Sequence, residues 1–144
     1  MPFESRQRAD LVDRCWSIYL CLVDTFTPPD NFHVEFSVAV ENALITGTLH
    51  VTVPIHANLK LSLREEYSFD RRHLAVHRYS YNVIDDNGDN LFRADNLPFH
   101  RTDFRRRALT HPPHHVHDAR GKVRSFTGQV EDFIREAKSL LASR

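Results

Sequence analysis

The feature that most constrains the fold is a stretch of alternating apolar and polar residues between positions 32 and 94. In residues 32–40 every second residue is Phe or Val, and the same period of two recurs in residues 59–63 and 79–83. This period places successive side chains on opposite faces of a strand. The dipeptide Asn87-Gly88 supplies the positive φ of a tight hairpin. The pattern predicts an antiparallel β-meander of about five strands over residues 32–94.

Two segments outside this stretch have the spacing of three and four that is typical of amphipathic helices. The first covers residues 5–26 and ends before Pro28 and Pro29, which cannot continue a helix. The second covers residues 127–142, with Thr127 expected as its cap. With 144 residues, of which 41% are hydrophobic, the chain can bury one core. We therefore predict a single α+β domain, 1–144, with both helices packed on the sheet.

The segment from 95 to 122 has neither period, and we expect it to be a long loop rich in His and Arg. Loops of this length in compact domains are usually functional or disordered. The net charge of the whole chain is zero, but residues 93–124 hold eight Lys or Arg against three Asp or Glu. Residues 1–92 hold eight against thirteen. This uneven distribution indicates an anionic partner.

Five of the ten histidines lie between positions 100 and 117. Three interpretations are open: metal ligands, acid and base groups beside a phosphate, or a polar loop without a chemical role. No Cys lies nearby, so a zinc ion would need imidazoles and a carboxylate such as Asp95 or Asp118. Histidine titrates near neutral pH and can act as base or acid. We favour the acid–base interpretation and expect no metal ion and no other cofactor.

The expected catalytic residues are two of His100, His115 and His117, with Asp95 to orient one of them. The prolines before His114 favour extended backbone. Side chains two residues apart then project to the same side, so His115 and His117 should share a side while His114 faces the other way.

The expected substrate-binding residues follow from the shape and charge of their side chains. Arg93, at the end of the last strand, and Arg78 offer planar guanidinium groups suited to a phosphate. Asn96 can hold a sugar hydroxyl or orient a histidine. The remaining members of this group are His114, Arg105 and Arg106.

Other polar residues of the predicted sheet receive less specific roles. Arg64, Arg78 and Tyr81 are the sheet residues expected nearest the site, although alternation sets Arg78 opposite Tyr81. Glu65 and Glu66, together with the pair of arginines at 71–72, are expected to decorate a solvated hairpin.

Four segments resemble one known family in their order and spacing: Leu61-Ser-Leu-Arg-Glu-Glu-Tyr, Arg78-Tyr-Ser-Tyr-Asn-Val-Ile-Asp-Asp-Asn-Gly, Phe92-Arg-Ala-Asp-Asn-Leu-Pro-Phe-His and His111-Pro-Pro-His-His-Val-His. Over roughly Ile45 to Leu141 the chain is similar to the TumE-like toxins of prokaryotic toxin–antitoxin pairs. The resemblance implies a cytoplasmic toxin, encoded beside a DNA-binding antitoxin that neutralises it. In the family pattern a Tyr usually stands at the position of Ala94 and a His at that of Phe99.

Together these observations predict a metal-independent ribonuclease that acts on cellular RNA, since cleavage at a ribose needs a base, an acid and a cation on the phosphate. One rival is a non-catalytic inhibitor that binds RNA or a protein. Another is a His-ligated, metal-dependent nuclease. A phosphoryl- or nucleotidyl-transferring toxin is disfavoured because the four glycines are not grouped as a phosphate-binding loop.

The expected partners are the antitoxin and RNA, and a homodimer is also considered. No run of about 18 apolar residues is present, so we expect no membrane association. The N-terminal residues MPFESRQRAD lack an apolar signal core, which favours the cytoplasm.

Overall fold

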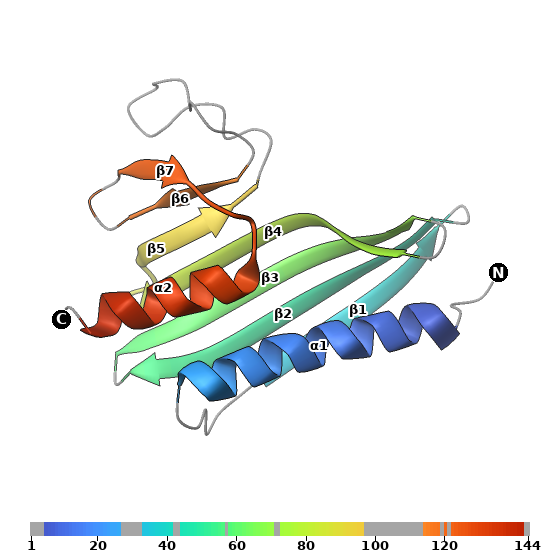
Figure 1. Cartoon of the computed structure of the whole chain (residues 1–144), viewed down its shortest axis with the longest axis horizontal. Helices are drawn as coiled ribbons and strands as arrows, with labels where there is room; N and C mark the ends of the chain where they lie inside the picture. The colour runs from blue at the N-terminus through green and yellow to red at the C-terminus, as the bar shows by residue number, and fades with distance from the viewer. Residues whose placement is uncertain are drawn as a thin grey trace.

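The computed structural model describes residues 5–26, 33–41, 44–56, 58–70, 73–96, 114–118, 120 and 122–142. Figure 1 shows their arrangement. The elements in chain order are α1 (Ser5–Thr25), β1 (His33–Glu41), β2 (Leu44–His56), β3 (Leu59–Asp70), β4 (His73–Asp85), β5 (Asn90–Asp95), β6 (His115–His117), β7 (Val123–Ser125) and α2 (Val130–Ala142). Among these residues, no helix is long and apolar enough to cross a membrane.

The strands form a seven-stranded antiparallel sheet in which each strand pairs with its neighbours in the sequence, from β1 to β7. The α+β class and the two packed helices are confirmed, and the predicted meander corresponds to β1–β5. The prediction of one loop from 95 to 122 is wrong, because Asp95 ends β5 and residues 115–117 form β6. Three-residue strands such as β6 and β7 are too short to show a period, so the sequence pattern could not reveal them.

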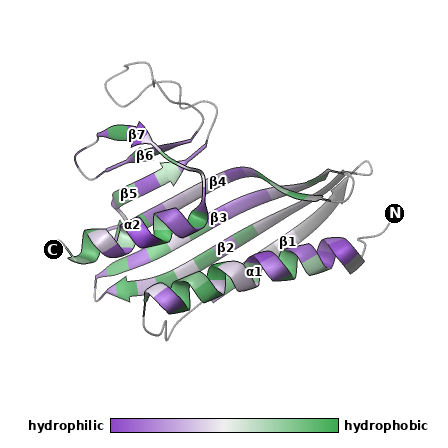
Figure 2. Cartoon of the chain, in the orientation of Figure 1, coloured by the Kyte–Doolittle hydropathy of each residue, from purple (hydrophilic) through white to green (hydrophobic). Residues whose placement is uncertain are grey.

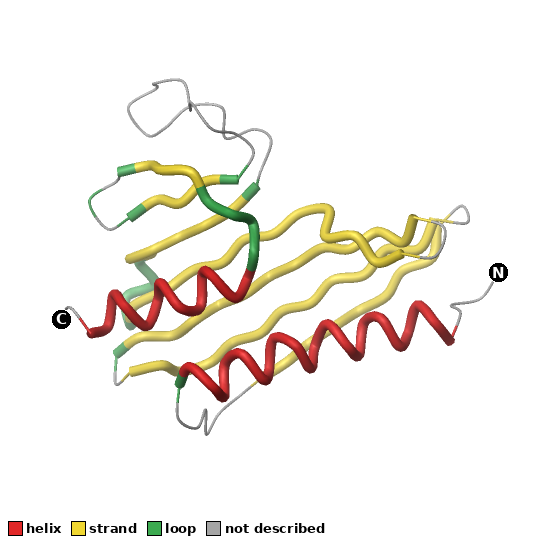
Figure 3. Tube along the Cα trace, in the orientation of Figure 1, coloured by secondary structure: helices red, strands yellow, loops and turns green. Residues whose placement is uncertain are grey.

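Both helices cover the same face of the sheet, as the ribbon in Figure 1 and the tube in Figure 3 show. The side chains on this face are mostly apolar and buried. Hydrophilic and hydrophobic residues alternate along the central strands (Figure 2), and because successive side chains of a strand point to opposite faces, the polar ones lie on the uncovered face. The core between sheet and helices contains Leu49, Val51, Val53, Leu61, Leu63, Tyr67, Tyr79, Tyr81, Val83, Phe92, Ala94 and Val116 from the strands. Burial of each large apolar side chain contributes about 1.5–3 kcal/mol to folding.

α1 packs its buried Leu11, Ile18 and Leu22 onto this face. Leu11 and Ile18 are seven residues apart and Ile18 and Leu22 are four apart, which places all three on one side of the helix. This period is why the sequence pattern located the helix correctly. In α2 the buried residues are Val130, Phe133, Ile134 and Ala137.

The start of α2 differs from the prediction. Thr127 does not cap the helix, because its Oγ1 accepts a hydrogen bond from the backbone N–H of Gln129 (3.2 Å). Gly128 has φ +83°, so the chain turns there before the helix starts. The carbonyl of Gln129 accepts the first helical hydrogen bonds, from the N–H groups of Asp132 and Phe133. The helix therefore begins at Val130.

Glu65 is the main exception to the apolar character of the covered face. The prediction of a solvated hairpin is wrong for this residue, which is 0% exposed. Alternation along β3 places Glu65 between Leu63 and Tyr67, on the side of the helices. Its carboxylate is held by the guanidinium of Arg14 and by the hydroxyl groups of two tyrosines.

Candidate functional site

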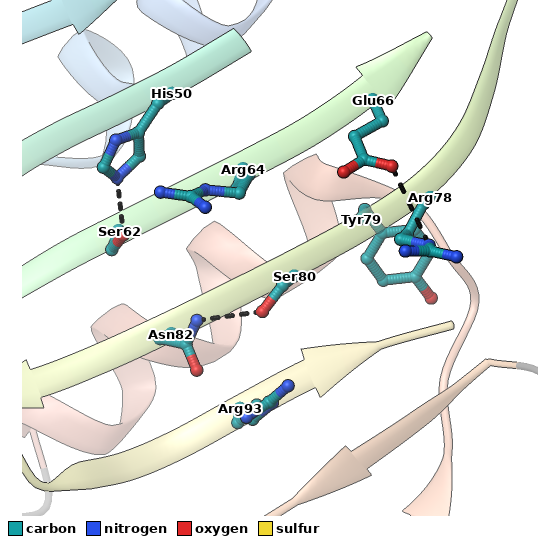
Figure 4. Close-up of a pocket in the computed structure, with 9 residues that line it drawn as sticks. All are labelled: His50, Ser62, Arg64, Glu66, Arg78, Tyr79, Ser80, Asn82 and Arg93. Carbon is teal, nitrogen blue, oxygen red and sulfur yellow. Dashed lines mark hydrogen bonds and ion pairs between the residues drawn. The ribbon is translucent and has the colours of Figure 1, made fainter. Parts of the chain in front are cut away.

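The uncovered face of the sheet carries a groove that crosses β2 to β5, with a volume of about 450 Å³. Figure 4 shows the side chains that line it, from the middle of four neighbouring strands. They are His50, Ser62, Arg64, Glu66, Arg78, Ser80, Asn82 and Arg93, with Tyr79 at the edge. A second hollow of about 510 Å³ continues over β1 and shares His50, Arg64 and Glu66 with the first.

The groove is rich in positive charge. Among the described residues that line the groove there are three arginines, Arg64, Arg78 and Arg93, and one carboxylate, Glu66. Arg78 Nε lies 3.8 Å from Glu66 Oε2. His50 Nε2 lies 3.0 Å from Ser62 Oγ. Burial lowers the pKa of His50, and the positive charge of Arg64 lowers it further. The positive charge of the groove at neutral pH therefore comes from the arginines.

At the β5 end of the groove, the pairing of β5 with β6 brings four predicted residues together. The register sets Asp95 opposite His115 and Arg93 opposite His117. Asp95 Oδ2 accepts a hydrogen bond from Arg93 Nε (2.9 Å), and Asp95 Oδ1 lies 3.1 Å from His115 Nε2. Asp95 is 0% exposed and His115 1% exposed, whereas His117 is partly exposed.

His115 and His117 project to the same side of β6, as the sequence predicted. Their ring centroids lie 4.8 Å apart in an edge-to-face arrangement. One ligand atom from each of Asp95, His115 and His117 lies within 4.8 Å of the others. We call these three residues the Asp95 cluster. The extended backbone of β6 explains their common side, because residues two apart on a strand share a face.

His114 lies on the other side of the sheet. Its ring stacks on that of Tyr79 with centroids 5.7 Å apart, and its Nδ1 lies 2.8 Å from the hydroxyl of Tyr79. A Cβ atom added at Gly128 would lie 3.0 Å from His114 Nδ1. The ring therefore fills space near the start of α2 and is separated from the groove by the sheet.

The other predicted substrate-binding residues are distributed differently. Arg78 lines the groove. Asn96 is engaged with β4, because its Oδ1 accepts a hydrogen bond from the N–H of Tyr79 (2.8 Å) and its Nδ2 donates to the carbonyl of His77 (3.3 Å). His100, Arg105 and Arg106 lie outside the described residues. Among the sheet residues expected near the site, Arg64 lines the groove, whereas Tyr81 is buried on the helix side.

A comparison with protein-family models shows the family to which the chain belongs. A family model described as Toxin TumE matches residues 26–141, which is most of the chain. The chain belongs to the TumE toxin family. Membership makes it a toxin of a toxin–antitoxin pair and implies an antitoxin partner. No curated protein and no solved structure gives a significant match.

One departure of this TumE toxin from the family pattern can now be placed. Ala94 is fully buried on the helix side of β5, where it is the register partner of Tyr81. Its neighbours Arg93 and Asp95 point to the opposite face. Ala94 therefore belongs to the core and not to the groove face. Phe99, the second departure, lies outside the described residues.

The sequence reasoning missed the polar residues that complete the groove. Ser62, Ser80 and Asn82 occupy even positions of β3 and β4, between the buried odd positions. The alternation that predicted the strands also contained this signal. His50 was missed although residues 48–53 alternate, with Leu49, Val51 and Val53 buried, so this alternation already placed His50 on the polar face of the sheet.

Proposed function

We propose that this TumE toxin is a ribonuclease that binds RNA in the groove and cleaves it at the Asp95 cluster. One observation carries the proposal. A buried carboxylate and two histidines lie at the end of a groove whose charge is mainly that of three arginines. Histidine is suited to proton transfer near neutral pH, and arginine to binding phosphate. The two requirements of RNA cleavage are therefore adjacent on one face of the sheet.

The groove supports the choice of an anionic polymer as substrate. Its cationic side chains come from three different strands, so they can contact successive phosphates of one chain. Ser62, Ser80 and Asn82 add hydrogen-bonding groups suited to sugar and base edges. The second hollow, which shares His50, Arg64 and Glu66 with the first and adds the carboxylate of Glu35, gives the groove an extended form. An extended groove favours a polymer over a small metabolite, and the arginines of the first hollow are the part that suits RNA.

In the proposed reaction, a base removes the proton of a ribose 2′-hydroxyl and the oxygen attacks the adjacent phosphorus. The bond to the 5′-oxygen breaks, and an acid gives a proton to that leaving oxygen. Of the two histidines, His117 is the better candidate for contact with RNA because it is partly exposed, whereas His115 is buried, and because it is the register partner of Arg93. Its Nε2 is buried, so its exposed part is the rest of the residue. Arg93 would stabilise the charge that develops on the phosphate.

The pair Asp95 and His115 suits a positioning role. Both side chains are buried, and Asp95 connects His115 to Arg93 through its two oxygens. A carboxylate in this position fixes the orientation of an imidazole and stabilises its protonated form. His100 remains the sequence-predicted candidate for the second proton transfer.

A second candidate function, a metal-dependent nuclease, is favoured by the same cluster. Two imidazole nitrogens and a carboxylate oxygen are common ligands of divalent transition metals, and three protein ligands leave positions open for water or substrate. Ligand atoms bound at about 2.0–2.2 Å from one ion lie roughly 3 to 3.5 Å apart. The distance of 3.1 Å between Asp95 Oδ1 and His115 Nε2 falls within this range.

The test is incubation of the purified toxin with end-labelled RNA, with EDTA or with added Mn²⁺ or Zn²⁺. Cleavage that resists EDTA and leaves 2′,3′-cyclic phosphate ends is the result expected of the acid–base ribonuclease. Cleavage that EDTA abolishes and metal restores would identify the metal-dependent nuclease instead. RNA that is bound but never cut would contradict both and identify a non-catalytic inhibitor.

A further inference from the structure

The Asp95 cluster has the donor set of a transition-metal site. Its three members lie on the paired strands β5 and β6, and one ligand atom from each lies within 4.8 Å of the others. Within the part of the chain that the structure describes, no other group of three or more His, Cys, Asp or Glu side chains comes together in this way. Two imidazoles and one carboxylate suit Zn²⁺, whereas Mg²⁺ prefers oxygen ligands. Zn²⁺ is therefore the ion that fits these residues.

The distances within the cluster require only a small adjustment to hold this ion. Asp95 Oδ1 and His115 Nε2, at 3.1 Å, already have the separation of two ligands of one zinc ion. Since such separations are roughly 3 to 3.5 Å, the most distant pair of ligand atoms has to approach by about 1 Å. His117 is the partly exposed member, so its ring has the most freedom to turn. The fourth position of the ion is then left for water.

Arg93 influences how strongly the cluster holds a cation. Its Nε donates a hydrogen bond to Asp95 Oδ2 (2.9 Å), while Asp95 Oδ1 lies toward His115. A partner of this kind fixes the orientation of a metal ligand. The guanidinium also balances the charge of the carboxylate, so the cluster with neutral imidazoles has no net negative charge to attract an ion. Such a site binds its ion reversibly, which suits regulation better than a permanent structural role.

Metal binding and acid–base catalysis compete for the same atoms. An imidazole nitrogen takes up a proton through the lone pair that also binds a metal ion, and a metal ligand must be deprotonated. With an ion bound, His117 cannot exchange a proton with the ribose or the leaving oxygen. The arginines Arg64 and Arg78 lie in the groove outside the cluster and still bind phosphate. The metal-bound toxin is therefore expected to hold RNA without cutting it.

We propose that Zn²⁺ binds reversibly to the Asp95 cluster and inhibits the toxin by taking the nitrogen that His117 uses for proton transfer. This inference rests on the proposed ribonuclease function and names a regulator of the same site. It differs from the metal-dependent nuclease in the sign of the effect, because the ion stops cleavage and does not support it.

The test uses the full-length toxin without a histidine tag. Calorimetry should find one Zn²⁺ per chain at the cluster, and the melting temperature should rise because only the folded chain assembles the site. Saturating Zn²⁺ should lower the rate of RNA cleavage about 100-fold, as the loss of a proton-transfer group does, and EDTA should restore it. RNA affinity, measured by fluorescence anisotropy, should change less than about threefold. Mg²⁺ at the same concentration should have none of these effects.

Two variants show whether the ion is at the cluster. His117→Gln should lose both the bound ion and the rise in melting temperature, because one ligand is missing. His33→Gln is the matched control, since His33 Nε2 lies 2.8 Å from Glu35 Oε1 and this exposed pair also combines an imidazole with a carboxylate. It belongs to no group of three ligands among the described residues. This variant should bind Zn²⁺ as the unmodified toxin does and remain inhibited. Circular dichroism shows whether both variants are folded.

The absence of Zn²⁺ binding would overturn the proposal, and so would equal binding by folded His117→Gln and the unmodified toxin. Cleavage that Zn²⁺ stimulates would also overturn it and would assign the cluster to the metal-dependent nuclease. A toxin that cuts no RNA with or without metal would contradict the ribonuclease function and, with it, the inhibition. Even then, one ion bound by the unmodified toxin and lost in His117→Gln would support the zinc site itself.

Discussion

The guanidinium of Arg14 donates hydrogen bonds to both carboxylate oxygens of the fully buried Glu65, at 2.9 and 2.6 Å. The hydroxyls of Tyr67 and Tyr81 donate to the same two oxygens at 2.5 Å each. Burial and the adjacent negative charge raise the pKa values of both tyrosines, so they remain protonated donors. These four bonds compensate the desolvation of the carboxylate and join α1 to β3 and β4.

Glu65→Gln should destabilise the fold strongly. The amide removes the negative charge, leaves Arg14 without its counterion and presents a donor to one of the tyrosine hydroxyls. Breaking a buried ion pair in this way typically costs about 3–5 kcal/mol. Urea unfolding measures the change in free energy. Glu66→Gln is the control, because Glu66 faces the groove and pairs with Arg78 only at 3.8 Å, so its loss should cost less than about 1 kcal/mol. Equal effects would contradict the structural role of Glu65.

Arg64→Ala should weaken RNA binding and make it less sensitive to salt. Each phosphate contact with single-stranded RNA contributes about 0.7 to the slope of log affinity against log salt concentration, so the slope should fall by roughly this amount. Arg135→Ala is the control, since Arg135 lies on α2 and pairs with Asp132 at 3.0 Å. Fluorescence anisotropy at several salt concentrations gives both slopes. An equal effect of the two substitutions would argue against the groove as the RNA site.

His50 should make the stability of the toxin depend on pH in the acidic range. Its pKa is lowered in the folded state by burial and by Arg64, whereas in the unfolded chain it returns to the ordinary 6.5. Between the two pKa values the unfolded chain binds more protons, so stability is present above pH 6.5 and is lost as the pH falls through the folded pKa. His50→Gln should therefore lose less stability between pH 7 and pH 5. Urea unfolding at both values measures this, and an unchanged pH dependence would contradict it.

The sequence predicted those parts of the molecule that repeat over several residues. The helix that contains Leu11 and Ile18 and the strand with Leu61 and Leu63 were located because burial of one face imposes a period on the chain. β6 escaped prediction because three residues cannot display a period, and its formation depends on pairing with β5 far away in sequence.

The sequence singled out the residues of the Asp95 cluster and predicted the common side of His115 and His117, but it did not predict which strand they would pair with. Residue type alone selected Arg93, Asp95, His115 and His117, which are the groups that suit phosphate binding and proton transfer. The register of β5 and β6 decides which of them meet, and single-sequence patterns hold no information on it. The buried role of Glu65 was missed for a similar reason: a charged residue is expected at the surface unless its partners, here on α1 and β4, are known.

Two nearby histidines on opposite faces of the sheet, His114 and His117, allow catalysis to be separated from folding. His117→Gln keeps a polar side chain of similar size and removes proton transfer, so the cleavage rate should fall at least about 100-fold. RNA affinity should change less than about threefold, because Arg64, Arg78 and Arg93 still bind the phosphates.

His114→Gln should have the opposite signature, because the His114 ring stacks on Tyr79 on the side of the sheet that carries the helices. It should lower the melting temperature by several degrees, as a loss of about 1 kcal/mol does in a domain of this size. Its cleavage rate should stay within a few fold of the unmodified toxin when measured below the melting transition. Cleavage of end-labelled RNA, anisotropy and thermal unfolding on both variants provide the comparison. If His114→Gln abolished cleavage while His117→Gln did not, the reaction would belong to the other face of the sheet and the proposed site would be wrong.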